Sequence, residues 1–241
     1  MLYSLLGMDG YRAIVLDVGG VLLLPHCAPI AQAVAPLGIS VDPATAQRAH
    51  FEGIHALDVL GHDASERGVY VEAFARALTP PGGDQAAVAA TLERIWRAPA
   101  IDVWRQPVPG SAEALRELAA AGWKLAIVSN SDGSVERQLH KQRICQVGEG
   151  LGVPVLAIID SAVVGVAKPA AAIFRHAIEP LGVAPEQAFY VGDSVRYDVQ
   201  GARAAGLTPV HFDPYALCAQ RADHAHVQSL REVPDTIEVK P

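Results

Sequence analysis

The most constraining feature of the chain is a run of apolar residues that ends in one carboxylate, residues 13–17 (AIVLD). A continuous Ile/Val/Leu run is typical of a strand buried on both faces, as in a parallel sheet. An unpaired carboxylate is costly inside such a strand, but at its carboxyl end Asp17 can point into a ligand-binding crevice. Gly19 and Gly20 then allow a sharp turn close to whatever Asp17 binds. A strand that merely leaves the sheet through a glycine turn is the alternative.

Strands and helices alternate after residue 106. Apolar runs at residues 124–128, 155–159, 188–191 and 209–212 predict four more strands, with helix-periodic stretches between them. Such alternation indicates βαβ units. The predicted fold class is therefore α/β, a three-layer Rossmann-like core with a mainly parallel sheet and an inserted all-helical cap.

The predicted cap covers residues 26–105, which are Ala-rich and helix-periodic and contain no convincing strand. We expect it to close over the crevice and exclude water. Four helices are predicted there, at about residues 28–37, 44–60, 69–78 and 88–96. The predicted domains are an α/β core over 11–25 and 106–233, the cap over 26–105, and terminal segments 1–10 and 234–241.

Composition limits the partners. The 241 residues are 51% hydrophobic and 19% charged, so a sizeable core is expected. A net charge of -7 argues against nucleic acids and anionic membranes, yet a local basic pocket could hold a small phosphorylated substrate. The three cysteines form no disulfide or zinc pattern, which favours the cytoplasm. No apolar run approaches the roughly 20 residues of a membrane span, and no secretory signal is expected.

Polar residues follow three of the predicted strands. Asp17 ends the first, Ser129 and Asn130 end the second, and Asp193 follows the strand at 188–191. Because the carboxyl ends of parallel strands meet at one sheet edge, we expect these side chains to converge on one crevice.

A lysine is expected at the same crevice. Pro169 fits the first turn of the helix that leads to the strand at 188–191, which would leave Lys168 at a helix entrance that favours anions. Asp17 and Asp193 would repel each other, and a divalent cation would remove that conflict. Oxygen ligands suit Mg²⁺, while Ser129 and Lys168 would hold phosphoryl oxygens. An Asp carboxylate is a known nucleophile for phosphoryl transfer.

Four segments in order resemble the motifs of the haloacid dehalogenase-like (HAD) hydrolase superfamily. They are residues 17–22 (DVGGVL), Ser129-Asn130, Lys168-Pro169 and residues 192–198 (GDSVRYD). The resemblance covers about residues 11–233, with the helical cap between the first two motifs.

The resemblance implies a role for each matching residue. Asp17 would be the nucleophile, and Lys168 would act with it in catalysis. The ligands of Mg²⁺ would be Asp17, Asp193 and the backbone carbonyl of Gly19. The phosphate would be bound by Ser129, Asn130, Gly19 and Gly20. The supporting residues would be Asp198 and Ser194.

One position departs from the family pattern. Most phosphatases of the family carry a second Asp two residues after the nucleophile, where this chain has Gly19. Glycine retains the carbonyl for the metal but loses the usual proton donor, and positioned acid–base catalysis contributes about 10²–10⁴-fold. His26 lies a few residues further on and is a candidate substitute acid.

We therefore expect a Mg²⁺-dependent phosphatase that hydrolyses a small phosphorylated metabolite through an aspartyl-phosphate on Asp17. Two alternatives stay open: a catalytically silent ligand-binding or regulatory protein of the same fold, and a hydrolase of non-phosphate chemistry, such as a dehalogenase. Asp193 favours phosphoryl chemistry because the dehalogenase relatives need no metal.

The remaining polar and aromatic residues are expected to be structural. Solvated or core-satisfied roles are expected for Arg48, His50, His55, Asp58, His62 and Asp63. Packing roles are expected for Trp96, Trp104 and Trp123. No metal site is expected at His211, His224 and His226, because they lack acidic companions at ligand spacing.

Overall fold

The computed structural model describes residues 10–60, 66–98 and 103–238. The chain divides into two compact units, each described here by itself. One contains the residues up to Leu22 and those from Pro107 onward, and the other is Leu23–Gln106. Within the described ranges, no helix is both long enough and apolar enough to cross a membrane.

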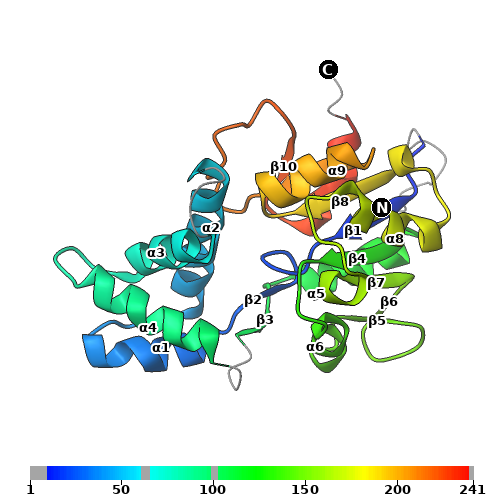
Figure 1. Cartoon of the computed structure of the whole chain (residues 1–241). Coiled ribbons are helices and arrows are strands. Elements are labelled where there is room, and N and C mark those ends of the chain that lie inside the picture. Colours follow the sequence, from blue (N-terminus) through cyan, green and yellow to red (C-terminus); the bar gives the residue numbers. More distant parts are fainter. Residues whose placement is uncertain (1–9, 61–65, 99–102, 239–241) are drawn as a thin grey trace. The chain divides into compact units, whose positions relative to one another are not determined.

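A six-stranded parallel sheet is the centre of the larger unit (Figure 1). Its order is β10-β9-β8-β1-β4-β7, so β1 lies inside the sheet between β8 and β4. All carboxyl ends therefore face one edge. The strands are β1 (Ala13–Leu16), β4 (Lys124–Ser129), β7 (Ala157–Asp160), β8 (Ala188–Gly192), β9 (Thr208–Phe212) and β10 (Ala225–Val227).

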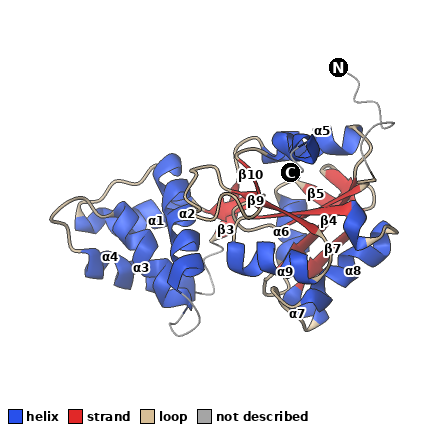
Figure 2. Ribbon diagram, turned by 90° about the horizontal axis from the view of Figure 1, so that it is seen from above, coloured by secondary structure: helices blue, strands red, loops and turns tan. Residues whose placement is uncertain are grey.

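Helices cover both faces of this sheet, with α8 and α9 on one face and α5 on the other (Figure 2). Val15 and Tyr190 of the sheet pack against Ile173 and Phe174 of α8 in one buried cluster. The helices of this unit are α5 (Ser111–Ala120), α6 (Val135–Lys141), α7 (Ser161–Val164), α8 (Ala171–Leu181) and α9 (Gln200–Ala204). The shorter helical turns are η2 (Pro185–Gln187), η3 (Val195–Val199) and η4 (Leu230–Glu238). The predicted α/β fold class is confirmed.

The smaller unit is helical and has its own apolar core. Val34, Phe74 and Leu92 come from three different helices and are fully buried together. Trp96 packs edge-on against Phe74, at 5.3 Å between ring centroids, which is the packing role expected for it. The helices are α1 (Cys27–Val34), η1 (Ala35–Leu37), α2 (Pro43–Leu60), α3 (Glu66–Leu78) and α4 (Gln85–Arg97).

Two strands were not predicted where the chain enters and leaves this unit. β2 (Leu23–Pro25) pairs with β3 (Trp104–Pro107), so the expectation of no strand within residues 26–105 is wrong at the end of that range. The pairing joins segments about 80 residues apart in sequence, and no side chain of β3 is fully buried. β3 therefore lacks the pattern of apolar residues from which strands are predicted, and this is why it was missed.

The strand predicted at residues 155–159 is shorter and later than expected. β7 begins at Ala157, and Val153–Val155 forms a separate strand, β6, beside β5 (Cys145–Val147). Leu156 separates the two strands and is half exposed. Its backbone N–H donates to the carbonyl of Leu125, at 2.8 Å. The apolar run is continuous in sequence, but its residues belong to two different sheets.

Candidate active site

Three carboxylates meet at the carboxyl edge of the large sheet. Asp17 follows β1 directly, and its backbone N–H donates to the Val191 carbonyl of β8 at 2.8 Å. Asp193 follows β8, and Asp198 lies in η3. Each offers one carboxylate oxygen within 4.8 Å of the others, and all three residues are at least nine-tenths buried. The structure thus brings Asp17 and Asp193 together, as their strand-end positions predicted.

Lys168 lies among these carboxylates. Its Nζ is 2.8 Å from Oδ1 of Asp17 and 2.7 Å from Oδ1 of Asp198, and its side chain is 3% exposed. It also donates to the hydroxyl of Tyr190 at 3.0 Å. Lys168 thus pairs with Asp17 and Asp198, and the three carboxylates offer only oxygen donors toward a cation.

Lys168 is positioned by a turn and not by the helix terminus that was predicted. Pro169 does not begin a helix: α8 starts at Ala171, and Lys168 and Pro169 lie in the turn before it. The side chain of Asn130 holds this turn, since its Oδ1 accepts from the Lys168 N–H at 2.8 Å. Its Nδ2 donates to the Lys168 carbonyl at 3.0 Å. Two hydrogen bonds from one amide thus fix the lysine backbone without a helix terminus.

Tyr190 is a site residue that sequence reasoning missed. Its hydroxyl lies 3.0 Å from Oδ1 of Asp198 and 3.3 Å from the Val128 carbonyl, and it can donate to either. A buried tyrosine hydroxyl needs such a partner. The available signal was a tyrosine inside an otherwise apolar strand, two residues before Gly192.

The electrostatics of the cluster are dominated by burial. Burial raises the pKa of Asp17 to about 7; the charge of Lys168 lowers it, and the charges of Asp198 and Asp193 raise it further. For Lys168, burial alone would lower the pKa, but the charges of Asp17 and Asp198 outweigh it and raise the pKa above its ordinary value. Lys168 is therefore charged at neutral pH, while Asp17 is poised to lose its proton.

The raised pKa of Asp17 predicts a pH-dependent stability of the metal-free protein. A carboxyl protonated more readily when folded than when unfolded stabilises the fold at low pH. That stability is lost as the pH rises from 3.8 through about 7. Compared with Asp17→Asn, we expect the wild type to lose on the order of 4 kcal/mol across this window.

Urea denaturation of both proteins with chelator present measures this difference. The comparison is needed because burial lowers the pKa of His224 to about 4, which acts in the opposite direction over the same window. Subtracting the variant removes the contribution of His224, which both proteins share. Parallel stability curves for the two proteins would contradict the prediction.

The turn after β8 fixes Asp198. The Ser194 N–H donates to Oδ2 of Asp198 at 3.0 Å, and the Ser194 Oγ accepts from the Tyr197 N–H at 3.2 Å. Gly192 has no space for a side chain, because a Cβ there would lie 2.2 Å from Cγ of Asp198. Ser194 thus supports Asp198 through its backbone and caps η3 through its side chain.

Gly192→Ala is expected to push Asp198 away from Lys168. The free energy of unfolding should fall by about 1–3 kcal/mol, the usual cost of overpacking. Urea denaturation measures the loss. Unchanged stability would mean that the turn has more room than these contacts indicate.

The other predicted site residues are placed as follows. Ser129 ends β4, is 5% exposed and is in register with Asp160 of β7. Gly20 has a φ of 69°, the left-handed conformation that favours glycine. His26 belongs to the smaller unit, where its Nδ1 accepts from Nε of Arg105 at 3.3 Å.

The residues expected to be structural are mostly in contact with their own unit. His50 is buried, and its Nδ1 lies 2.9 Å from the hydroxyl of Tyr70. Arg48 forms an exposed ion pair with Glu52. Trp104 packs edge-on against His50, and Trp123 lies against Phe189. His62 and Asp63 lie outside the described residues.

Comparison with known proteins identifies the family. The family described as haloacid dehalogenase-like hydrolase matches residues 11–206, most of the chain. The chain therefore belongs to the haloacid dehalogenase-like hydrolases, as the four motifs indicated. It is an enzyme of the hydrolase class by this membership.

Several relatives carry phosphatase names. The chain is 35% identical to a phosphoserine phosphatase of Thermus thermophilus over 141 residues, 58% of this chain and 53% of that protein. It is 34% identical to a glyceraldehyde 3-phosphate phosphatase of Methanopyrus kandleri over 107 residues, 44% and 43% of the two chains. The chain thus spans about half the length of these curated relatives.

Solved structures share the fold. The structure of a HAD-hydrolase from Bacillus subtilis bound to magnesium has a TM-score of 0.58 and 19% sequence identity. The match covers 96% of this chain and all of that one. At this identity the likeness shows a common fold and says nothing of the substrate.

Proposed function

We propose that this chain is a Mg²⁺-dependent phosphatase that hydrolyses a small phosphorylated metabolite through an aspartyl-phosphate on Asp17. The observation that carries the proposal is the group of Asp17, Asp193 and Asp198, two of which, Asp17 and Asp198, contact the ammonium of Lys168. The phosphatase names of several relatives support the same chemistry.

The carboxylate group fits a magnesium ion. Its donors are oxygen atoms of three buried carboxylates that lie within 4.8 Å of one another. Mg²⁺ prefers such ligands together with substrate phosphate. Asp17, Asp193 and the backbone carbonyl of Gly19 would hold the ion, and its charge would keep Asp17 ionised and offset the charge of the phosphoryl group.

The chain's own residues then account for the two steps. An oxygen of Asp17 attacks phosphorus, and the bond between phosphorus and the leaving oxygen breaks. The Ser129 hydroxyl and the Lys168 ammonium hold phosphoryl oxygens during the transfer. Water next attacks phosphorus, which releases inorganic phosphate and restores the Asp17 carboxylate. Asp198 and Asn130 keep Lys168 in position for both steps.

The smaller unit and the compartment complete the proposal. We propose that residues 26–105 act as a cap that selects the substrate. The residues at the strand ends act on the phosphoryl group, which all phosphorylated metabolites share, so they would not distinguish one metabolite from another. We also assign the protein to the cytoplasm, because its three cysteines are buried and form no disulfide within the described residues.

Phosphate release from p-nitrophenyl phosphate and acetyl phosphate tests the proposal, followed by a panel of phosphorylated metabolites, each with Mg²⁺. We expect Mg²⁺-dependent release. Halide release from a haloacid without phosphate release would instead indicate dehalogenase chemistry. A Mg²⁺-dependent thermal shift with phosphate analogues but no turnover would indicate a silent binding protein.

Gly19 makes a specific prediction about leaving groups. Acetyl phosphate and p-nitrophenyl phosphate release stable anions that need little protonation, whereas an alkyl phosphate releases a strong base. We expect Gly19→Asp to raise turnover of alkyl phosphates by up to about 10²–10⁴-fold and to affect acetyl phosphate much less. Gly19 is not among the described residues with positive φ, so its backbone conformation does not itself disfavour a side chain. Initial rates with both substrates measure the effect.

His26 provides the comparison for this variant. If His26 already supplies the proton, His26→Ala lowers the alkyl phosphate rate and changes its pH profile, and Gly19→Asp restores it in the double variant. If both Gly19→Asp and His26→Ala leave the alkyl phosphate rate unchanged, proton transfer to the leaving group does not limit the reaction.

A further inference from the structure

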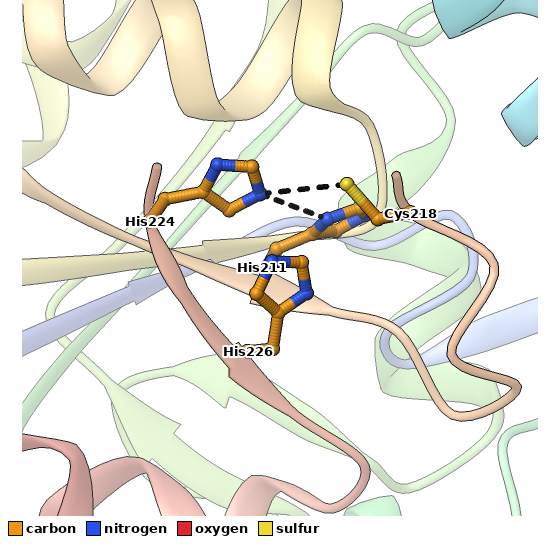
Figure 3. A group of neighbouring side chains, drawn as sticks. All are labelled: His211, Cys218, His224 and His226. Atoms are coloured by element: carbon orange, nitrogen blue, oxygen red, sulfur yellow. Dashed lines mark hydrogen bonds between the residues drawn. The ribbon is translucent and has the colours of Figure 1, made fainter. Parts of the chain in front are cut away.

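A second group of metal-ligating side chains lies at the edge of the large sheet (Figure 3). It consists of His211, Cys218, His224 and His226, whose ligand atoms all lie within 4.8 Å of one another. His211 lies in β9 and His226 in β10, directly opposite each other in the parallel register. Cys218 and His224 come from the connection between these strands. Figure 3 shows the four side chains turned toward a common centre.

The sequence did not predict this group, for a physical reason. Spacing along the chain shows no acidic companion for the three histidines, but strand pairing places His226 beside His211. The connection between the strands then places the thiol of Cys218, seven residues after His211, beside the histidines. The ligand set is therefore made by the fold and uses sulfur in place of a carboxylate.

His211 and His224 each have one ring nitrogen, here called the outer nitrogen, that contacts a hydrogen-bond acceptor outside the group. The other ring nitrogen of each is called the inner nitrogen. Nε2 of His211 lies 2.9 Å from the Asp193 carbonyl, which can only accept, so this nitrogen carries the hydrogen. Nδ1 of His224 lies 3.4 Å from Oδ2 of Asp223 and donates there for the same reason. The inner nitrogens, Nδ1 of His211 and Nε2 of His224, then carry lone pairs and face each other at 3.2 Å. Two acceptors at this distance need a proton or a cation between them.

His226 is also suited to a metal. Nδ1 of His226 lies 3.6 Å from Oδ2 of Asp213, and the His226 side chain is 9% exposed. Neither ring nitrogen makes a hydrogen bond within the described residues. A buried ring nitrogen without a hydrogen bond is costly, and a bound cation would remove that cost. Imidazole binds a metal in its neutral form, through a ring nitrogen that carries no hydrogen.

The distances agree with a four-coordinate site. Zn–N bonds of about 2.0–2.1 Å and a Zn–S bond of about 2.3 Å place tetrahedral nitrogen ligands about 3.3 Å apart and nitrogen and sulfur about 3.6 Å apart. The inner nitrogens of His211 and His224 are 3.2 Å apart, and Sγ of Cys218 is 3.9 Å from Nε2 of His224. Outer hydrogen bonds to a carbonyl and a carboxylate are the partners that metal-binding histidines normally have.

We propose that His211, Cys218, His224 and His226 form a structural site for a soft divalent transition metal, with Zn²⁺ as the expected ion. Four protein ligands leave no open position, so the site is not itself catalytic. The ion would tie the connection between β9 and β10 to the sheet. Through the His211 hydrogen bond to the Asp193 carbonyl, it would also hold the loop that carries Asp193.

Metal analysis of the full-length chain without an affinity tag tests the site. After removal of metal with a chelator, Zn²⁺ or Co²⁺ is added, unbound ion is removed by gel filtration, and bound metal is measured by mass spectrometry. We expect one ion per chain. The Co²⁺ form should show intense tetrahedral ligand-field bands and a thiolate charge-transfer band.

Variants identify the ligands. Cys218→Ser should lose the thiolate band, and His224→Ala should lower Zn²⁺ affinity by more than the roughly 10–100-fold that an outer partner contributes. Asp223→Ala removes such an outer partner and should cost about that 10–100-fold. Cys27→Ser and His176→Ala should retain the ion, because Cys27 is a buried thiol of the smaller unit and His176 is exposed on α8.

The outcomes separate this site from the carboxylate group. Asp17→Asn should retain Zn²⁺, and excess Mg²⁺ should not displace it, because Mg²⁺ selects oxygen ligands. Loss of the bound ion in Asp17→Asn, or no ion after gel filtration, would overturn the proposal. If Cys218→Ser does not fold, the Co²⁺ spectrum of the wild type still decides: octahedral bands without a thiolate transition would overturn it as well.

Discussion

Asp17→Asn is expected to abolish Mg²⁺-dependent phosphate release, lowering kcat by on the order of 10³-fold or more, as loss of a nucleophile does elsewhere. The amide has nearly the shape of the carboxylate but cannot attack phosphorus. It also removes one buried negative charge from a group of three, so the protein should stay folded and gain stability at neutral pH. Initial rates with p-nitrophenyl phosphate and urea denaturation measure the two effects separately.

Asp132→Asn is the matched control for this variant. Asp132 follows the same sheet edge after β4, but its carboxylate accepts from the hydroxyl of Ser134 at 2.5 Å and takes no part in the carboxylate group. The rate of the control should be unchanged. Equal turnover in Asp17→Asn and wild type would remove Asp17 from the mechanism.

Lys168→Met has the largest expected effect on stability. It deletes the ammonium that contacts Asp17 and Asp198 and leaves three carboxylates in a buried space. Removing one partner of a buried ion pair costs about 3–5 kcal/mol. Turnover should also be lost, since the ammonium proposed to hold phosphoryl oxygens would be gone. Urea denaturation with and without Mg²⁺ is the measurement.

Mg²⁺ should stabilise Lys168→Met by a larger amount than it stabilises the wild type, because the variant has more unbalanced negative charge for the ion to offset. Lys141→Met, on the exposed end of α6, should change neither stability nor turnover. Wild-type stability in Lys168→Met would show that the ammonium does not offset the charge of the carboxylates, and the electrostatic account of the site would then be wrong.

The sequence predicted the parts of the fold that depend on local patterns. The apolar run before Asp17 has no polar interruption because β1 is fully buried inside the sheet. Strand ends of a parallel sheet share one edge, which is why Asp17 and Asp193 could be placed together without coordinates. The small sheet of β2 and β3 was missed because it depends on pairing between distant segments with little buried surface.

The site residues that escaped prediction depend on side-chain contacts. Asn130 was expected to bind phosphate, and its side chain in addition holds the Lys168 turn by two hydrogen bonds. Tyr190 supplies a hydroxyl to Lys168 and Asp198 from inside the strand. The pairing of β9 with β10 places His211 beside His226. None of these contacts has a signature in residue spacing, because each requires the packed sheet.

The most direct test of the central claim is to trap the covalent intermediate. Wild-type protein with Mg²⁺ and acetyl phosphate is quenched in acid within the first turnover, digested, and its peptides are analysed by mass spectrometry. We predict one added phosphoryl group on the peptide that contains Asp17, and none in Asp17→Asn. Phosphate release by the wild type with a phosphoryl group on another residue, or on none, would contradict the account.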